Sequence, residues 1–262
     1  MNLFHAIILG IVQGLTELLP ISSSAHLTLI PWAFHWGDIP DSFDVALHFG
    51  TLLAIGIFFF KDWVNLLKGG YKKFIKKEDN PEGKMLLYII IATLPGGIIG
   101  VILEKYAQEV LSKPIIIAIA LIVMGVVLYI IDKRSRSKIE YKDINLKQGL
   151  LIGTSQALAF IPGVSRSGIT MTIARALGIK RESAARFSFM LSAPIVLGAC
   201  LLTFTKFEFS MSAIIGILVS FIVGIVVIKF LLEYLKKGSF KIFAIYRVII
   251  GVIVLICAIV FH

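Results

Sequence analysis

The chain has 262 residues, of which 58% are hydrophobic and only 16% charged, whereas a globular protein carries about 25% charged residues. Several apolar runs approach the roughly 20 residues that cross a bilayer, so we predict a single all-α, polytopic integral membrane domain over residues 1–262. The net charge of +10 then reflects basic cytoplasmic loops, and we expect no nucleic-acid partner.

The first apolar segment, residues 3–19, is interrupted by Pro20 and a run of serines. The next apolar piece, residues 25–34, is too short to cross a bilayer. Together they predict a re-entrant helical hairpin, whose irregular backbone is tolerated at membrane depth only where protein or a cavity surrounds it.

Three spans follow this hairpin, then a second hairpin and three more spans. The predicted total is six transmembrane helices and two re-entrant hairpins. The spans are predicted at residues 43–60, 85–103, 114–131, 187–205, 210–232 and 243–261. Lysine-rich loops follow the first and third spans, as expected of cytoplasmic loops. The loop from residue 61 to residue 84 is the longer of these two.

The second hairpin begins with an apolar segment at residues 146–161 and continues as P-G-V-S-R-S-G-I-T-M-T from Pro162 to Thr172. It repeats the first hairpin at an offset of 143 residues, with the pairs Gly10/Gly153, Gln13/Gln156, Leu15/Leu158, Ser22/Ser165 and Ser24/Ser167. Each half has three spans, an odd number, so the second half enters the membrane from the opposite side. We therefore predict inverted-topology repeats of about residues 1–132 and 145–262, with the first hairpin entering from outside.

Two such hairpins would bring the helix N-termini at Ser22–Ser24 and Ser165–Ser167 into one pocket, where their amides favour an anion. Arg166 adds a planar donor that holds a phosphate through two hydrogen bonds. Glycines beside these serines let the backbone approach a bound group. The predicted substrate-binding residues are Ser22, Ser24, Gly163, Ser165, Ser167, Gly168 and Thr170.

Gln13 and Glu17 lie four residues apart, on one face of a helix whose C-terminal end favours a cation. An alternative is that Glu17 and Arg166 form an ion pair that only locks the two halves together. That alternative leaves unexplained His26, three residues after Ser23.

The two copies differ where chemistry needs them to differ. At the same offset Glu17 is matched by Phe160, His26 by Ile169, and Arg166 by Ser23. Such asymmetry suits phosphoryl transfer, with a carboxylate on one side and a phosphate-binding cation on the other. His48, inside a predicted span, is assigned to packing or to a helix–helix hydrogen bond.

At these residues the sequence resembles the undecaprenyl-pyrophosphate phosphatases of the bacitracin-resistance type. Their first motif has Glu or Gln, three residues, Glu, then a proline and a serine-rich turn with a histidine. The second, P-G-x-S-R-S-G-x-T, is matched from Pro162 to Thr170. The resemblance implies hydrolysis of the terminal phosphate of a C55 isoprenyl diphosphate in the bacterial plasma membrane, which recycles the carrier lipid for peptidoglycan synthesis and confers bacitracin resistance.

The resemblance also implies roles. Glu17 with Gln13 would hold Mg²⁺ or Ca²⁺, and Gln13 is the amide form of a position that is either Glu or Gln in the family. Arg166 would hold the diphosphate, and either Ser23 or His26 would attack phosphorus, with Ser23 slightly favoured and His26 assisting. The predicted catalytic residues are therefore Glu17, Ser23, His26 and Arg166.

The implied partners are the polyprenyl diphosphate and membrane lipids, and a homodimer is left open. The rival interpretation is a lipid flippase or secondary transporter, because broken helices in inverted repeats also occur in transporters.

Overall fold

A computed structural model describes residues 2–37, 39–203 and 209–260, and within these ranges the side chains of residues 101 and 103–110 lie outside the description. The described chain is helical and contains no strand. In chain order the elements are α1 (Leu3–Thr16), α2 (Ser23–Phe34), α3 (Asp41–Phe58), α4 (Phe60–Phe74), α5 (Pro81–Leu111), α6 (Pro114–Arg134), the 3₁₀ helix η1 (Tyr141–Asp143), α7 (Leu146–Ser155), the 3₁₀ helix η2 (Gln156–Phe160), α8 (Arg166–Ala176), α9 (Arg181–Thr203), α10 (Met211–Lys237) and α11 (Lys241–Val260).

Six helices are long and apolar enough to cross a membrane. They are α3, α5, α6, α9, α10 and α11, and each coincides with one predicted span. The prediction of an all-α polytopic membrane protein with six transmembrane helices is therefore confirmed. Half of the most apolar stretch of α9 is buried, more than in any other of these spans, so α9 is the central helix of the bundle.

Two predicted loops are wrong. Residues 61–84 were predicted as a loop, but residues 61–74 belong to α4 and residues 81–84 to the start of α5. The second predicted loop, at residues 104–113, is also mostly helical, because α5 continues to Leu111. Of the charged residues expected in that second loop, Glu104, Lys105 and Glu109 have side chains outside the described part. Gly69 lets α4 pack closely against the start of α5, since a Cβ there would lie 2.5 Å from Asn80 Oδ1.

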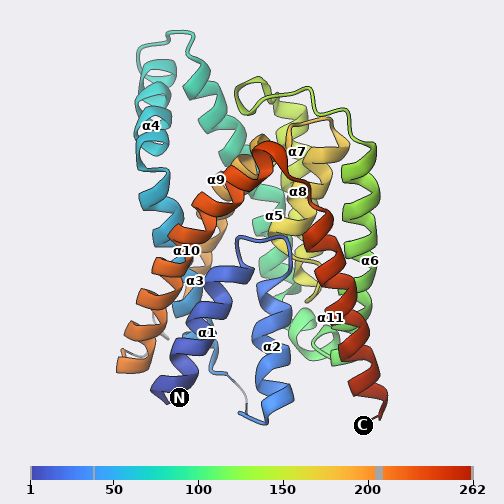
Figure 1. The fold of residues 1–262 in the computed structure, drawn as a ribbon. Coiled ribbons are helices and arrows are strands. Elements are labelled where there is room, and N and C mark those ends of the chain that lie inside the picture. The colour runs from blue at the N-terminus through green and yellow to red at the C-terminus, as the bar shows by residue number, and fades with distance from the viewer. Residues whose placement is uncertain (1, 38, 204–208, 261–262) are drawn as a thin grey trace.

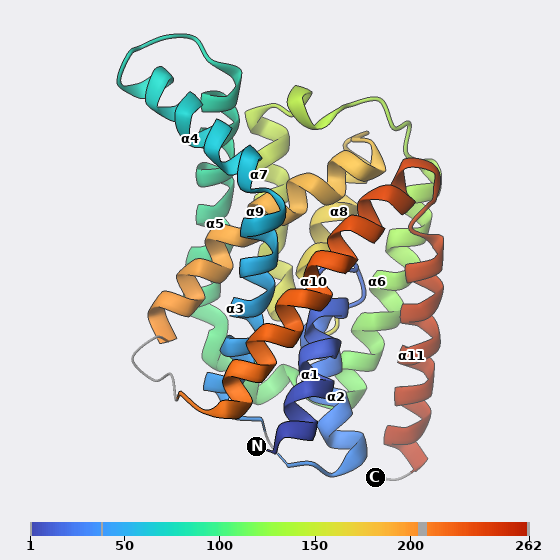
Figure 2. The same ribbon diagram turned by 60° about the vertical axis from the view of Figure 1, so that its left-hand side comes forward.

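The two broken segments approach each other from opposite ends of the bundle (Figure 1). Helix α1 starts beside the chain termini and ends at mid-height, where α2 turns back, while α7 starts at the other end and α8 returns there (Figures 1 and 2). None of these four helices is among the six long apolar spans. The re-entrant placement and the inverted repeat stay predictions.

A buried carboxylate joins several helices at the end of the bundle that carries α4, opposite the chain termini. Asp132 of α6 is 4% exposed and accepts hydrogen bonds from Arg175 Nε (2.7 Å), Arg181 Nε (2.9 Å) and the backbone amide of Phe240 (3.1 Å). These donors come from α8, the start of α9 and the residue before α11. Because a buried carboxylate needs such partners, this junction fixes the C-terminal end of α8.

Candidate active site

The tips of the two broken segments have the same backbone design. Ser22 caps α2 with φ 78°, and Ser165 caps α8 with φ 72°. Each hydroxyl accepts a hydrogen bond from the amide three residues on, Ala25 N (3.4 Å) or Gly168 N (3.0 Å), and lies 3.2 Å from the second serine hydroxyl, Ser24 or Ser167. Positive φ is unfavourable for serine, and such strain is retained where the surrounding structure imposes it.

The tips also contact each other. The amide of Gly163 donates to Ser22 Oγ (3.2 Å), and Ser167 Oγ donates to the carbonyl of Leu19 (3.1 Å). Residues 141 and 148 positions apart in sequence are thus hydrogen-bonded. The predicted meeting of the Ser22–Ser24 and Ser165–Ser167 helix starts is therefore present in the structure.

Arg247 of α11 holds both tips together. Its guanidinium is fully buried and donates to the carbonyls of Pro20 (3.1 Å), Gly163 (2.6 Å) and Val164 (3.0 Å). Among the residues that the structure describes, no carboxylate forms an ion pair with it, and its Nε has no hydrogen-bond partner. A buried cation without a carboxylate is costly, so the carbonyls of the tips are what stabilise it.

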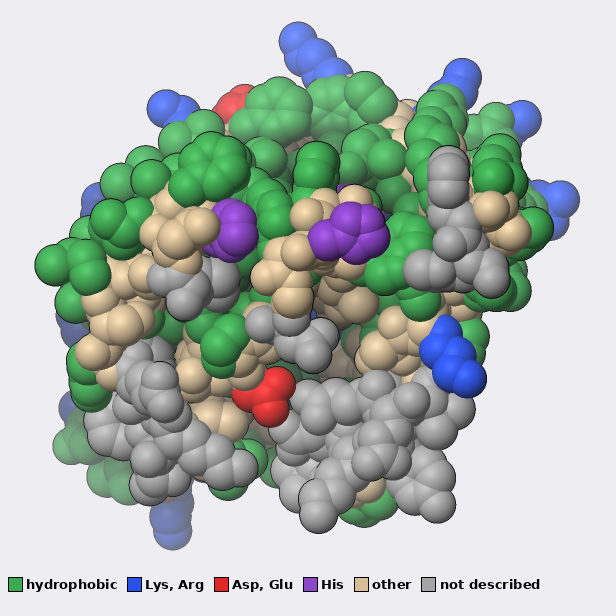
Figure 3. Space-filling model, turned by 90° about the horizontal axis from the view of Figure 1, so that it is seen from below, with side chains coloured by type: hydrophobic (Ala, Val, Ile, Leu, Met, Phe, Trp, Pro, Cys, Tyr) green, Lys and Arg blue, Asp and Glu red, His purple; other side chains and the backbone are tan. Residues whose placement is uncertain are grey.

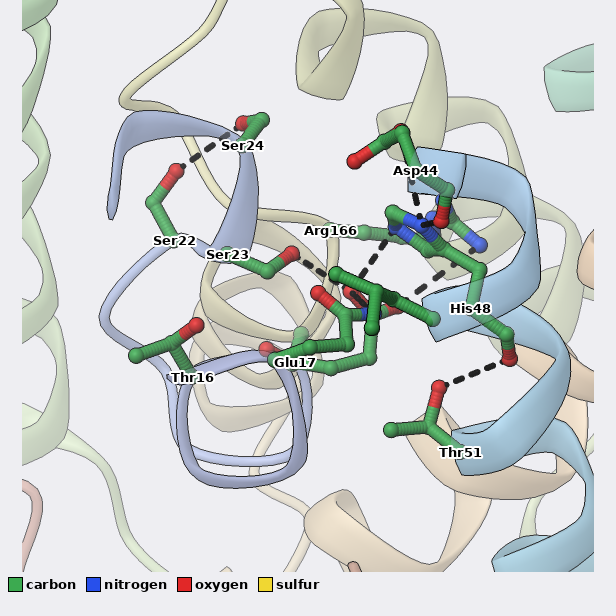
Figure 4. Close-up of polar contacts among 12 residues, drawn as sticks. Thr16, Glu17, Ser22, Ser23, Ser24, Asp44, His48, Thr51 and Arg166 are labelled. Atoms are coloured by element: carbon green, nitrogen blue, oxygen red, sulfur yellow. Dashed lines mark hydrogen bonds and ion pairs between the residues drawn. The ribbon is translucent and has the colours of Figure 1, made fainter. Parts of the chain in front are cut away.

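Glu17 is the centre of a cluster of polar side chains (Figure 4). It caps the C-terminal end of α1, and its Oε2 accepts a hydrogen bond from Ser23 Oγ at 2.5 Å. Arg166 Nη1 lies 3.9 Å from Glu17 Oε1, and this nitrogen is buried with no hydrogen-bond partner. The structure thus brings together three of the four predicted catalytic residues and leaves one guanidinium nitrogen able to donate to a ligand.

His48 of α3 also belongs to this cluster. Its Nε2 lies 3.4 Å from Glu17 Oε2, and its Nδ1 donates to the carbonyl of Asp44 (2.9 Å) and lies 3.6 Å from Asp44 Oδ2. From the sequence, His48 was assigned to packing or to a helix–helix hydrogen bond, and neither its partner Glu17 nor its neighbour Asp44 was predicted. The available signal was an ionisable residue inside an apolar span, which is uncommon unless it is functional.

His26, the fourth predicted catalytic residue, faces another helix. Its Nδ1 lies 2.7 Å from the carbonyl of Ser22, so this nitrogen donates, and in the neutral ring Nε2 accepts from the hydroxyl of Tyr246 at 2.8 Å. The two rings are also stacked, with centroids 5.7 Å apart. Ser23 Oγ therefore has Glu17, rather than His26, as its hydrogen-bond acceptor.

Among the predicted substrate-binding residues, Thr170 already has hydrogen-bond partners within the protein. Its hydroxyl bonds to the carbonyl of Arg166 (2.8 Å) and to Ser188 Oγ of α9 (2.7 Å). The two glycines are explained by the backbone and by packing. Gly163 has φ +96°, which favours glycine, and a Cβ on Gly168 would lie 2.6 Å from Arg247 Nη1. A role for these three residues in substrate binding stays a prediction.

The donors beside Glu17 fit a hard cation. Gln13 Nε2 lies 3.4 Å from Glu17 Oε2, while Gln13 Oε1 is buried without a hydrogen-bond partner. The described part of the chain contains no group of three or more His, Cys, Asp or Glu side chains arranged to hold a metal. Mg²⁺ is commonly bound through one or two carboxylates and takes its other ligands from water and substrate phosphates. Glu17 supplies one carboxylate, and Gln13 Oε1, which has no hydrogen-bond partner, is a second oxygen ligand.

Comparison with known proteins assigns the chain to a family. The family model described as bacitracin resistance protein BacA matches residues 6–253. The chain belongs to this family. Both sequence motifs and the whole cluster around Glu17 lie within the matched range.

Similar curated proteins are each named undecaprenyl-diphosphatase. The one from Pelotomaculum thermopropionicum is 46% identical over 261 residues, covering 98% of this chain and 97% of the relative. Those from Moorella thermoacetica and Caldicellulosiruptor bescii are 45% and 48% identical, each covering 97% of both chains. The family named by resemblance in the sequence analysis is thus confirmed.

Proposed function

We propose that this protein is an undecaprenyl-diphosphatase that removes the terminal phosphate of a C55 isoprenyl diphosphate. The observation that carries the proposal is the meeting of Glu17, Ser23 and Arg166 beside two helix N-termini. Helix N-termini and a guanidinium favour a phosphate, and a hydroxyl bonded to a carboxylate is an activated nucleophile. The names of the family's curated members support the same substrate.

In the proposed first step, Ser23 Oγ attacks the terminal phosphorus. The hydroxyl proton passes to Glu17 Oε2, its present hydrogen-bond partner. The bond between the terminal phosphorus and the bridging oxygen breaks, and its electron pair leaves with undecaprenyl phosphate. Ser23 now carries the phosphoryl group, and Arg166 donates to the phosphoryl oxygens as their charge develops.

In the second step, water attacks the phosphoserine. Glu17 returns to the carboxylate form by passing its proton to the departing Ser23 oxygen, while the attacking water gives one proton to the released phosphate. The two steps together consume one water and release one phosphate per lipid. His26, bonded to Ser22 and Tyr246, orients the first turn of α2 in this scheme.

The proposal includes a divalent cation, Mg²⁺ or Ca²⁺, held by Glu17 and the Oε1 atom of Gln13. When bound, the cation would neutralise negative charge on the diphosphate. Metal dependence and bacitracin resistance are proposals for this chain, supported by the donor set and by the family description.

We place the protein in the bacterial plasma membrane with the site open to the outer side. Lys and Arg are concentrated in residues 61–84, 133–147 and 236–241, which lie at the α4 end of the bundle (Figure 1). Among the described side chains, the end that carries the termini shows few Lys or Arg (Figure 3). Cationic loops stay in the cytoplasm, so this difference supports the orientation.

Thiol labelling tests the orientation. After both native cysteines, Cys200 and Cys257, are replaced by serine, Asp41→Cys should react with a membrane-impermeant reagent in intact cells. The matched variant Lys77→Cys should react only after permeabilisation. The reverse pattern would place the site on the cytoplasmic side.

Phosphate release by the purified protein tests the activity. One phosphate per undecaprenyl diphosphate is expected, together with a trapped phospho-enzyme that is stable in acid and labile in base, as phosphoserine is. A phosphate that is labile in acid, survives in Ser23→Ala and disappears in His26→Ala would assign the attack to histidine. No phosphate release at all would favour the alternative of a flippase or transporter.

A further inference from the structure

Helix α4 carries an apolar face that no other described helix covers. Its α5-facing side buries Leu66, Gly69 and Gly70. On the other side five large apolar residues are exposed by half or more, and we call them the α4 stripe: Phe60 (65%), Leu67 (61%), Tyr71 (57%), Phe74 (50%) and Ile75 (66%). Spacings of seven, four and three residues from Phe60 to Phe74 place the stripe on one helix face.

Lysines border this stripe without acidic partners. The exposed lysines of the segment are Lys61, Lys68, Lys72, Lys76 and Lys77, and no ion pair involves any of them within the described ranges. The nearby Asp62 is paired with Arg186, and Asp79 with Lys84. Residues 60–84 hold seven lysines against four acidic residues, Asp62, Glu78, Asp79 and Glu82, so net positive charge borders the stripe.

A hollow of about 370 Å³ lies on the same surface. It is lined by Lys68, Lys72 and Lys76 and by the stripe residues Leu67 and Tyr71. Three lysines beside an apolar floor match a lipid that has an anionic headgroup and acyl chains. Long lysine side chains reach the headgroup level while their methylenes stay against apolar surface.

The position of α4 agrees with that ligand. It continues from the lysine-rich end of the span α3 after a break at Phe59, and it leans outward from the bundle beside α5 (Figure 2). A basic amphipathic helix in this position is typical of a helix at a membrane surface. A second copy of the chain is a poorer occupant, because a two-fold contact would set these lysines against each other.

We propose that the α4 stripe and its lysines form a binding surface for anionic phospholipid of the cytoplasmic leaflet. The apolar side chains enter the acyl region, and Lys68, Lys72 and Lys76 contact one headgroup phosphate in the hollow. The surface is separate from Glu17 and does not depend on the proposed phosphatase reaction.

A fluorescent label on α4 tests this proposal. The full chain without its native cysteines carries Phe74→Cys, labelled with an environment-sensitive dye, in phosphatidylcholine nanodiscs with increasing phosphatidylglycerol. We expect a blue shift that grows with the phosphatidylglycerol fraction and is reversed by salt. Replacing Lys68, Lys72 and Lys76 with Gln should abolish the response, because each lysine near an anionic surface changes binding about fivefold.

A matched control removes three cations elsewhere at the same end: Arg136→Gln, Lys138→Gln and Lys147→Gln should keep the parent response. Phosphate release in pure phosphatidylcholine reports that each variant is folded. If the triple variant does not fold, the single variant Lys72→Gln takes its place, and it should weaken the response to phosphatidylglycerol about fivefold. A blue shift independent of phosphatidylglycerol would overturn the proposal. The proposal would also be overturned if the control variant lost the response equally, or if the blue shift appeared only in nanodiscs that hold two copies of the chain.

Discussion

The two tips share a backbone and differ in their reactive side chains. Ser22 and Ser165 have nearly the same φ, the same hydroxyl neighbour two residues on and the same bond from the third amide. At the position of Glu17, however, the second tip has Phe160, whose ring packs directly against Gly100. One design thus forms two anion-favouring helix starts, while the carboxylate is present only once.

The glutamines show how small the decisive difference is. Gln13 and Gln156 both leave a buried Oε1 without a hydrogen-bond partner. Gln13 Nε2 faces Glu17, whereas Gln156 Nε2 donates to the carbonyl of Gly153 in the preceding helix α7, at 3.4 Å. The neighbouring carboxylate therefore makes Gln13 part of a candidate cation site, whereas Gln156, which has no such neighbour, is a structural residue.

The largest expected effect comes from removing this carboxylate. Glu17→Gln should lower kcat/KM for phosphate release on the order of 10³-fold, because Ser23 loses its proton acceptor. Phe160→Leu, at the equivalent position of the other tip, should stay within about fivefold if only packing changes there. Near-native activity of Glu17→Gln with unchanged metal dependence would make the carboxylate a structural lock.

Arg166 is expected to come next. Arg166→Lys keeps the charge but loses the planar pair of donors, so we expect a loss on the order of 10²-fold in kcat/KM. Thermal unfolding in detergent, measured on the same samples, should change little because Arg166 Nη1 has no hydrogen bond to lose. A parallel collapse of stability would instead support the ion-pair lock.

Arg247→Lys should have a smaller effect on activity and a larger one on stability. A lysine cannot donate to the carbonyls of Pro20, Gly163 and Val164 together, so the tips are less firmly joined. Leaving a buried acceptor unpaired costs about 1–3 kcal/mol, and kcat/KM should fall about tenfold. The control Lys241→Gln, exposed at the start of α11, should unfold like the parent, and an unchanged unfolding midpoint in Arg247→Lys would argue against the tie.

The cap serines should give the smallest effects. Ser22→Ala and Ser165→Ala each remove one capping acceptor, worth about 1 kcal/mol of stability. Chemical unfolding in detergent should show losses of similar size for both, with Ser22→Ala slightly larger because it also accepts from Gly163 N. If only one of the two variants lost stability, the two serines would not stabilise their helix starts equally despite their common geometry.

Hydropathy was sufficient to predict the spans, and the offset of 143 residues was sufficient to predict that Ser22 and Ser165 correspond. Helix α4 was missed because its lysines hide the helical spacing of its apolar residues. Arg247, Tyr246 and Asp44 were missed for another reason. Each is a single polar residue outside the motifs, and its partner is set by the packing of α11 or α3, which no local pattern encodes.

Arg247 lies in α11, the last helix that the structure describes, yet it bonds to carbonyls in both tips. During synthesis the first tip is complete more than two hundred residues before this guanidinium leaves the ribosome, since Arg247 and Pro20 are 227 positions apart. The nascent chain therefore carries Glu17 and Ser23 in the membrane long before their surroundings are fixed. Assembly of the reactive cluster is tied to the synthesis of α11, so a chain that stops before α11 should insert in the membrane without a finished site.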